Sequence, residues 1–159
     1  MFHIVLVEPE IPQNTGNIAR TCAVTGAALH LVRPLGFSLD DKSLKRAGLD
    51  YWGELNVHLY DSFAQVEQAY PEARFFLFTT HAKRSYADAC YRDGDFFVFG
   101  KETAGLGPAL IARRGEDTVR IPMRPGLRSL NLSNAVALSL YEALRQTGFA
   151  GLTEQGEPF

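Results

Sequence analysis

Cysteine, long apolar runs and an excess of either charge are all scarce in this sequence. Cys22 and Cys90 lie far apart and neither belongs to a CxxC pair, which argues against a zinc site and fits a reducing compartment. The longest apolar runs, such as residues 75–78 and 96–99, fall far short of the ~18 residues that a membrane-spanning helix needs. The first residues lack the basic region and cleavage site of a secretory signal. We therefore expect no metal, no membrane association and a cytoplasmic location.

The charges nearly balance, with 16 Lys and Arg residues against 18 Asp and Glu residues and a formal net charge of −2. This balance excludes a protein that coats nucleic acid through excess positive charge, but it leaves room for a local basic site. Hydrophobic residues make up 46% of the 159 residues, which is enough for one ordinary domain with its own core. We predict a single domain over residues 1–159, with 151–159 as a frayed tail.

Short runs rich in β-branched and aromatic residues recur along the chain and are candidate strands. They are residues 4–7, 29–32, 57–60, 75–78, 96–99 and 119–121. Most are apolar throughout, as strands covered on both faces are, and the intervals between them are long enough for crossover helices. Helices are predicted at residues 17–25, 41–47, 62–70 and 108–113, and between Asn131 and Gly148. The sequence thus predicts an α/β fold with a mostly parallel sheet flanked by helices.

The first polar segment follows the first predicted strand and contains Asn14, Asn17 and Arg20. If Asn17 caps the helix, Arg20 lies in its first turn, where a cation opposes the helix dipole. That placement favours an anion, such as a phosphate or a carboxylate, as the partner of Arg20. The alternative is an Arg20 that reaches solvent or pairs with Glu8 or Glu10.

The second segment is a loop with three glycines, Gly100, Gly105 and Gly107, between a buried strand and a predicted helix. Ligands of open α/β sheets bind at the carboxyl ends of strands, and glycine lets the backbone approach them closely. The spacing matches neither the dinucleotide fingerprint nor the triphosphate-binding loop, which weakens both interpretations. Taken alone, such a loop is also compatible with a purely structural turn.

The third segment gathers hydrogen-bonding side chains around the start of the last predicted helix. They are Ser129, Asn131, Ser133 and Asn134, and Arg124 and Arg128 are close by. Helix capping explains one or two of the four, but not all. The segment therefore predicts a site for a polar or anionic ligand.

Each segment carries a recognisable motif. The motifs read Asn14-x-Gly16-Asn17-x-x-Arg20, then Phe99-Gly100-x-Glu102-x-x-Gly105-Leu106, then Ile121-Pro122-Met123 with Ser129-Leu130-Asn131-x-Ser133-x-Ala135. In order, spacing and context they resemble the three motifs of the SPOUT, or α/β-knot, RNA 2′-O-ribose methyltransferases. The resemblance covers essentially the whole chain. Residues 46–51 and 141–143 resemble the small bacterial subfamily that modifies the wobble nucleotide of tRNA.

The resemblance implies S-adenosylmethionine as the methyl donor, bound in the cleft of a C-terminal trefoil knot. Its sulfonium already activates the methyl group, so neither a metal nor a nucleophilic cysteine is needed. The knot rests on the resemblance alone, because threaded chains are too rare to infer from a sequence pattern. The implied cofactor contacts, mostly through backbone groups, are Phe78, Thr79, Gly100, Gly105, Ile121, Met123, Ser129 and Leu130.

Methyl transfer to a ribose requires that the 2′-hydroxyl be positioned and relieved of its proton. The resemblance makes Arg20 the essential residue. Because a guanidinium is effectively always protonated, we expect Arg20 to clamp the target phosphate and stabilise the developing oxyanion rather than act as a base. Tyr141 is expected to bind the nucleotide or share a proton, with a packed helix aromatic as the alternative. The residues expected to orient Arg20, the cofactor or the ribose are Asn14, Glu102, Ser129 and Asn131.

The resemblance also implies a homodimer, with the site completed across an interface that includes the last helix. The stripe of Leu132, Val136, Leu140 and Leu144 is compatible with this interface and equally with an intrachain core. The implied partner is the anticodon loop of tRNA, methylated at a wobble cytidine or uridine. Leucine isoacceptors are the expected substrates.

The chain is too short to carry a separate RNA-binding domain as well, so we expect its own surface to hold the tRNA. Tyr51 and Trp52 are candidates to stack on a splayed base, unless they are buried. Two other functions compete: a non-catalytic RNA-binding or assembly protein that retains the knot, and an oxidoreductase, which the missing glycine fingerprint weakens. The candidate basic contacts, each alternatively an ordinary solvated charge, are Lys42, Lys45 and Arg46 on the predicted helix and Arg33, Lys83, Arg84, Arg124 and Arg128 in loops.

Overall fold

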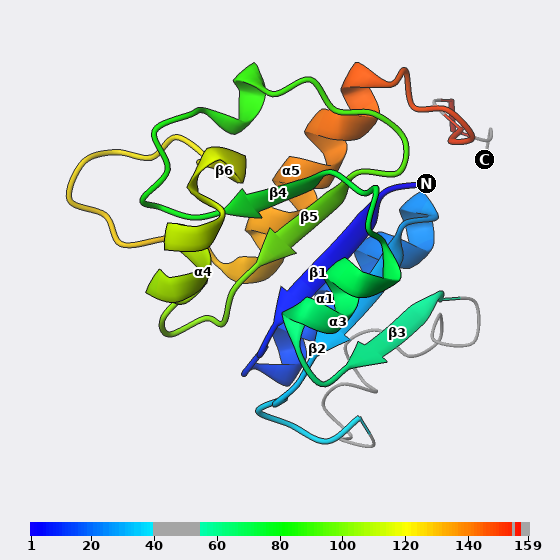
Figure 1. Cartoon of the computed structure of the whole chain (residues 1–159). Coiled ribbons are helices and arrows are strands. Elements are labelled where there is room, and N and C mark those ends of the chain that lie inside the picture. The colour runs from blue at the N-terminus through cyan, green and yellow to red at the C-terminus, as the bar shows by residue number, and fades with distance from the viewer. Residues whose placement is uncertain (40–54, 154, 157–159) are drawn as a thin grey trace.

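The computed structural model describes residues 1–39, 55–153 and 155–156, and six strands of these residues form one sheet (Figure 1). The strand order is β3-β2-β1-β5-β4-β6, and every neighbouring pair is parallel. The predicted parallel α/β sheet is therefore confirmed. The strands are β1 (His3–Val7), β2 (Ala28–Val32), β3 (Val57–Tyr60), β4 (Phe75–Phe78), β5 (Phe96–Phe99) and β6 (Thr118–Val119).

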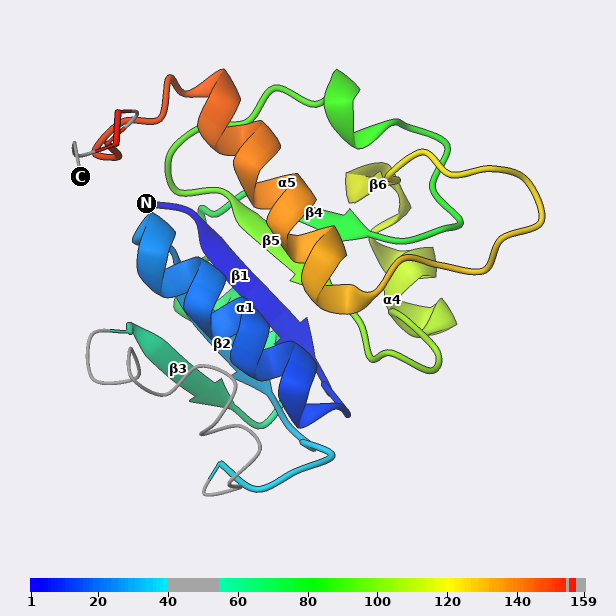
Figure 2. The ribbon, with the colours of Figure 1, turned by 180° about the vertical axis from the view of Figure 1, so that it is seen from behind.

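Helices cover both faces of the sheet. They are α1 (Pro12–Thr25), α3 (Phe63–Ala69), α4 (Pro108–Arg113) and α5 (Leu132–Gln146), with two short 3-10 turns, η2 (Tyr86–Asp88) and η3 (Gly115–Asp117). Helices α1 and α5 pack side by side on one face (Figure 2), and α3 lies on the other. Within the described ranges, no helix is both long and apolar enough to cross a membrane. The expected helix at 41–47 lies outside the described residues.

The sixth strand is shorter than the predicted 119–121, because Arg120 pairs elsewhere. Its backbone N–H donates to the carbonyl of Arg84, and its own carbonyl accepts from the N–H of Tyr86, both at 2.9 Å. These bonds end the pairing of β6 with β4 at Val119. They also hold the chain that leaves β6 against the chain that leaves β4.

Helix α1 starts at Pro12, not near Asn17 as predicted. Proline suits the first helical position because it has no N–H that would need a partner. Ile11, the residue before it, makes no side-chain cap. Arg20 consequently lies more than two turns inside the helix. The prediction that it opposes the helix dipole in the first turn is therefore wrong.

Helix α5 begins as predicted, because the side-chain oxygen of Asn131 accepts from the backbone N–H groups of Ser133 and Asn134 at 2.9 and 3.3 Å. Val136, Leu140 and Leu144, three residues of the predicted stripe, are buried against the sheet and α1. The stripe is thus part of the intrachain core, and it does not itself supply an interface.

The strands are buried on both faces, which explains their continuous apolar runs. Phe97 and Ile4 belong to the core under α1 and α5, while Phe96 and Val5 belong to the core under α3. Cys22 lies in the first core, and its burial raises the pKa of the thiol to about 12. The thiol is neutral at neutral pH, so Cys22 acts as a small apolar core residue.

Three histidines meet on the α3 face of the sheet. Nδ1 of His3 and Nε2 of His30 are 3.0 Å apart, and the other ring nitrogen of His30 lies 3.3 Å from the hydroxyl of Tyr60. The ring of His58 stacks on His30 with 4.8 Å between centroids. Desolvation, with smaller contributions from neighbouring charges, lowers the pKa of His3 to about 4 and that of His30 to about 3. Both rings therefore remain neutral well below pH 6.5.

This cluster predicts a loss of stability in mild acid. Unfolded histidine takes up a proton near pH 6.5, whereas the folded cluster does not until about pH 4, so protons favour the unfolded chain in between. Each histidine held neutral weakens folding by up to about 1.4 kcal/mol per pH unit across this window. We expect the drop in melting temperature between pH 7 and pH 5 to be smaller in His30→Gln. Exposed His81 supplies the control: His81→Gln should leave the drop unchanged, and an equal drop in both variants would contradict the prediction.

Candidate active site

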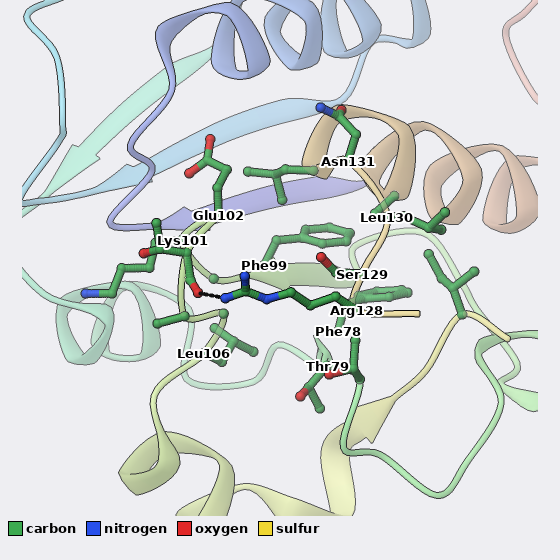
Figure 3. Close-up of a pocket in the computed structure, with 18 of the residues that line it drawn as sticks. Phe78, Thr79, Phe99, Lys101, Glu102, Leu106, Arg128, Ser129, Leu130 and Asn131 are labelled. Atoms are coloured by element: carbon green, nitrogen blue, oxygen red, sulfur yellow. Dashed lines mark hydrogen bonds between the residues drawn. The ribbon is translucent and has the colours of Figure 1, made fainter. Parts of the chain in front are cut away.

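A pocket of about 620 Å³ opens at the carboxyl ends of β4, β5 and β6 (Figure 3). Its walls come from the chain after each of these strands, from the start of α5 and from Ile11 and Asn14 at the start of α1, so all three motifs contribute to it. Phe78 and Phe99 stack with 4.6 Å between their centroids in its apolar wall. The eight residues expected to contact a cofactor, which all line this pocket, are Phe78, Thr79, Gly100, Gly105, Ile121, Met123, Ser129 and Leu130.

The loop after β5 folds tightly back on itself. The N–H of Gly105 donates to the carbonyl of Lys101 at 2.7 Å, and Gly105 has a φ of 64°, a conformation that favours glycine. A side chain on Gly100 would place its Cβ 2.0 Å from the carbonyl carbon of Gly105 and 2.1 Å from the backbone nitrogen of Leu106. Glycine is therefore required at position 100, and the folded loop presents backbone to the pocket.

Three polar motif residues bond to one another across the fold. The carboxylate of Glu102 accepts from the backbone N–H of Glu10 at 2.8 Å, from that of Ile11 at 3.1 Å, and from the side-chain amide of Asn14 at 3.1 Å. Asn14, which is buried, accepts in turn from the amide of Asn131 at 3.0 Å. This chain of bonds joins the β5 loop, the start of α1 and the start of α5. It fixes these three segments relative to one another.

A second set of bonds holds the same loop to the segment before α1. Lys101 forms an ion pair with Glu8 at 2.7 Å, and Thr103 donates its backbone N–H to the carboxylate of Glu10 at 2.9 Å. The Thr103 N–H and hydroxyl together lower the pKa of Glu10. Glu8 and Glu10 therefore both bind the β5 loop. Neither forms the ion pair with Arg20 that the sequence left open as an alternative.

Two predicted catalytic residues lie away from this pocket. Arg20 is exposed on α1, and Tyr141 is 45% exposed on α5. The packed alternative for Tyr141 is therefore wrong. Arg20 shares the outer side of α1 with Val24, and Tyr141 shares that of α5 with Leu138. Since the two helices are neighbours (Figure 2), their outer sides present both predicted catalytic residues to solvent.

The predicted RNA contacts divide into several groups. Arg128 lines the main pocket and donates to the carbonyl of Thr103 at 3.4 Å (Figure 3). Lys83 and Arg84 line a second, smaller cavity. Arg33 forms an ion pair with Asp61 at 2.9 Å, and Arg124 is exposed. The candidates that lie outside the described residues are Lys42, Lys45, Arg46, Tyr51 and Trp52.

Sequence reasoning missed Arg120, which lines both cavities. Its position directly after a short apolar strand was the available signal, because ligands gather at the carboxyl ends of parallel strands. His81, which also lines the main pocket, lies in the loop after β4. Within the described part of the chain, no three metal-binding side chains assemble into a group that could hold a metal ion.

Comparison with known proteins identifies relatives along nearly the whole chain. A sequence profile described as "SpoU rRNA Methylase family" matches residues 1–141. A tRNA (cytidine(34)-2′-O)-methyltransferase of Burkholderia pseudomallei (strain 1106a) is 56% identical over 155 residues, which are 95% of this chain and 99% of the relative.

Solved structures agree with this relationship. One, concerned with "the 2-OH methylation of C/U34 on tRNA", has a TM-score of 0.89 and 49% identity, and the match covers 93% of this chain and 97% of that one. The SpoU methyltransferase AviRb from Streptomyces viridochromogenes, in complex with the cofactor AdoMet, has a TM-score of 0.82 and 27% identity over 91% of this chain and 57% of that one.

Proposed function

Because the chain belongs to the SpoU methylase family, we propose that it is a methyltransferase of the wobble ribose of tRNA. It uses S-adenosylmethionine to methylate the 2′-hydroxyl of nucleotide 34. The observation that carries this proposal is the similarity over nearly the full length to a tRNA (cytidine(34)-2′-O)-methyltransferase. The same similarity favours an enzyme over a non-catalytic knot protein and over an oxidoreductase.

The main pocket suits S-adenosylmethionine in size and in character. Pockets of roughly 300–1,000 Å³ hold small ligands of this class, and this one measures about 620 Å³. Gly100 lets the β5 loop fold without filling the space, and Phe78, Ile121 and Leu130 provide apolar wall. The backbone after β4, β5 and β6 would hold the cofactor there. When bound, the cofactor supplies an activated methyl group.

Residues of the chain itself hold the pocket in shape, bind the RNA and handle the proton. The bonds from Glu102 through Asn14 to Asn131 keep the pocket walls in register, which matters because small misplacements of reacting groups are costly. Arg20 clamps the target phosphate through its planar set of donors and stabilises negative charge that develops on the 2′-oxygen. Tyr141 binds the nucleotide or shares the proton that leaves the hydroxyl.

The position of Arg20 and Tyr141 supports a homodimer. Neither residue lines the pocket of its own chain, so we infer that a second copy brings them to it. Val24 and Leu138 are 54% and 46% exposed beside them, and such apolar side chains favour burial between subunits. The exposed sides of α1 and α5 therefore form the proposed interface, with the site completed across it.

The substrate and the knot complete the proposal. A cytidine or a uridine at position 34 fits the relatives, and leucine isoacceptors remain the predicted tRNAs.

The trefoil knot is supported by family membership and by the path of residues 120–131, which return from β6 to α5 beside the chain that follows β4. Because tRNA is used in the cytoplasm, we propose the same location for the enzyme.

Methyl transfer from labelled S-adenosylmethionine to leucine tRNA transcripts tests the function. We expect label on the ribose of nucleotide 34 alone, read by nuclease mapping. A transcript with a single 2′-deoxynucleotide at position 34 is the matched control and should accept none. Label on a base, or no transfer by protein that melts cooperatively, would overturn the proposed function.

A further inference from the structure

A second cavity lies beside the main pocket and is strongly basic. It measures about 250 Å³ and is lined by Lys83, Arg84, Ser85, Arg120, Pro122 and Met123. Arg120 and Met123 also line the main pocket, so the two cavities adjoin. We propose that this basic cavity binds a backbone phosphate of the RNA, next to the nucleotide that reacts. This inference rests on the proposed function, because it assumes an RNA substrate.

The distribution of ion pairs supports a polyanionic ligand at this place. Among the described residues, six of the Lys and Arg side chains pair with a carboxylate: Arg33, Arg74, Lys101, Arg113, Arg114 and Arg145. Over the same described ranges, Lys83, Arg84 and Arg120 form no ion pair. Arg124 and Arg128, which follow Arg120 in the same segment, form none there either. The protein has a net charge of −2, and yet four described cations without an ion pair line the two adjoining cavities: Lys83, Arg84, Arg120 and Arg128.

The backbone holds these cations in place. The segment after β4 and the segment after β6 are joined by two backbone hydrogen bonds at 2.9 Å, between Arg120 and both Arg84 and Tyr86. The guanidinium of Arg84 also donates to the carbonyl of Asp88 at 3.1 Å. The two segments that carry these cations are therefore fixed relative to each other before a phosphate binds, so binding has to order only their side chains. Arginine suits this role because its fork of N–H groups matches phosphate oxygens.

The lining of the basic cavity favours a phosphate over a base, since it offers three cations and, among the described residues, no aromatic side chain on which a base could stack. A free anion would need no second pocket next to it. An RNA strand needs both cavities, because every ribose that enters the main pocket has a phosphate next to it. The cavity therefore acts as an anchor for the chain of nucleotides, whereas base identity is read elsewhere.

Binding of a leucine tRNA transcript to the double variant Lys83→Ala, Arg84→Ala tests the anchor. Both side chains are exposed, so we expect the melting temperature and the affinity for S-adenosylmethionine to stay at the wild-type values. The tRNA dissociation constant should rise tenfold or more. The slope of log affinity against log salt should fall by about 0.7 for each phosphate that the variant no longer neutralises, the value for single-stranded sites.

Arg92→Ala is the matched control. Arg92 is an exposed cation that forms no ion pair with the described carboxylates. It lies just before β5, at the amino-terminal ends of the strands, whereas the cavities lie at the carboxyl ends. Its removal should change tRNA affinity less than twofold. An equal loss in Arg92→Ala, or an unchanged salt slope in the double variant, would overturn the anchor.

Methylation assays on the same proteins separate this inference from the proposed function. If wild-type protein methylates nucleotide 34 and the double variant keeps its KM for tRNA, the anchor is wrong while the function stands. If wild-type protein binds tRNA but methylates no ribose, and the double variant still binds more weakly, the function is wrong while the anchor stands. A raised KM with kcat retained supports both.

Discussion

Gly100→Ala is expected to weaken binding of S-adenosylmethionine by about 100-fold. The added Cβ would lie 2.0–2.3 Å from backbone atoms of Gly105 and Leu106, a distance that no flexible side chain can relieve. The loop must open, and the 2.7 Å hydrogen bond from Gly105 to Lys101 is broken as it does so. A local distortion of roughly 3 kcal/mol corresponds to a loss of affinity of about 100-fold. Calorimetric titration of the cofactor measures this, and methyl transfer should fall in parallel.

Gly107→Ala provides the matched control in the same loop. A Cβ at Gly107 meets nothing within 4 Å, and its φ of −59° is open to any residue. We expect cofactor affinity to remain within about twofold of wild type, since only a small change in the N-cap of α4 is involved. If Gly100→Ala binds the cofactor as well as Gly107→Ala does, the folded loop is not what forms the site.

Arg20→Ala is expected to lower the rate of methyl transfer by about 10²–10³-fold while the cofactor still binds. The side chain lies on α1 and does not line the main pocket of its own chain, so its loss leaves the cofactor walls intact. Removing one donor that stabilises a developing oxyanion lowers kcat by about 10²–10³-fold. Single-turnover transfer to tRNA measures the rate, and calorimetry measures cofactor affinity. Loss of cofactor binding instead would remove Arg20 from the substrate side of the reaction.

Mixing the two impaired variants tests whether Arg20 acts across an interface. In a mixed dimer, the Gly100→Ala subunit offers an intact Arg20 and the Arg20→Ala subunit offers an intact pocket. Random exchange of subunits would then restore about a quarter of wild-type activity, because half of the dimers carry one complete site of two. If folded subunits exchange and activity does not recover, Arg20 does not act on the pocket of a partner subunit. Either Arg20 then serves the pocket of its own chain, or the active form is not a dimer.

The strand positions could be predicted because their signal is local. Continuous apolar runs such as residues 96–99 leave few alternatives to a buried parallel strand. The start of α5 was equally readable, since Asn131 caps the helix with its own side chain. The start of α1 was not. Its preceding N–H groups are satisfied by Glu102, about 90 residues further along the chain, and no local pattern announces such a partner.

The candidate site, too, could be predicted only in part. The strand ends indicated the region of the pocket, because ligands gather there, whereas its individual residues could be named only because the motifs resemble those of a known family. Their mutual bonding could not be predicted, since Asn14, Glu102 and Asn131 have neither charge complementarity nor short spacing to reveal it. The concentration of unpaired cations around Arg120 was also hidden, because it depends on which other cations find carboxylates.

By itself, then, the sequence determined the parallel α/β sheet, the ends of the strands at which polar residues gather, and the family of RNA ribose methyltransferases that these motifs resemble. The tertiary structure decided that Glu102, Asn14 and Asn131 hold three segments together, that Arg20 and Tyr141 face outward, and that a basic cavity adjoins the main pocket. The physical reason is the separation along the chain over which each interaction acts. Burial periodicity and capping act over a few residues, whereas hydrogen bonds between loops and the pairing of surface charges depend on distances that only the folded chain defines.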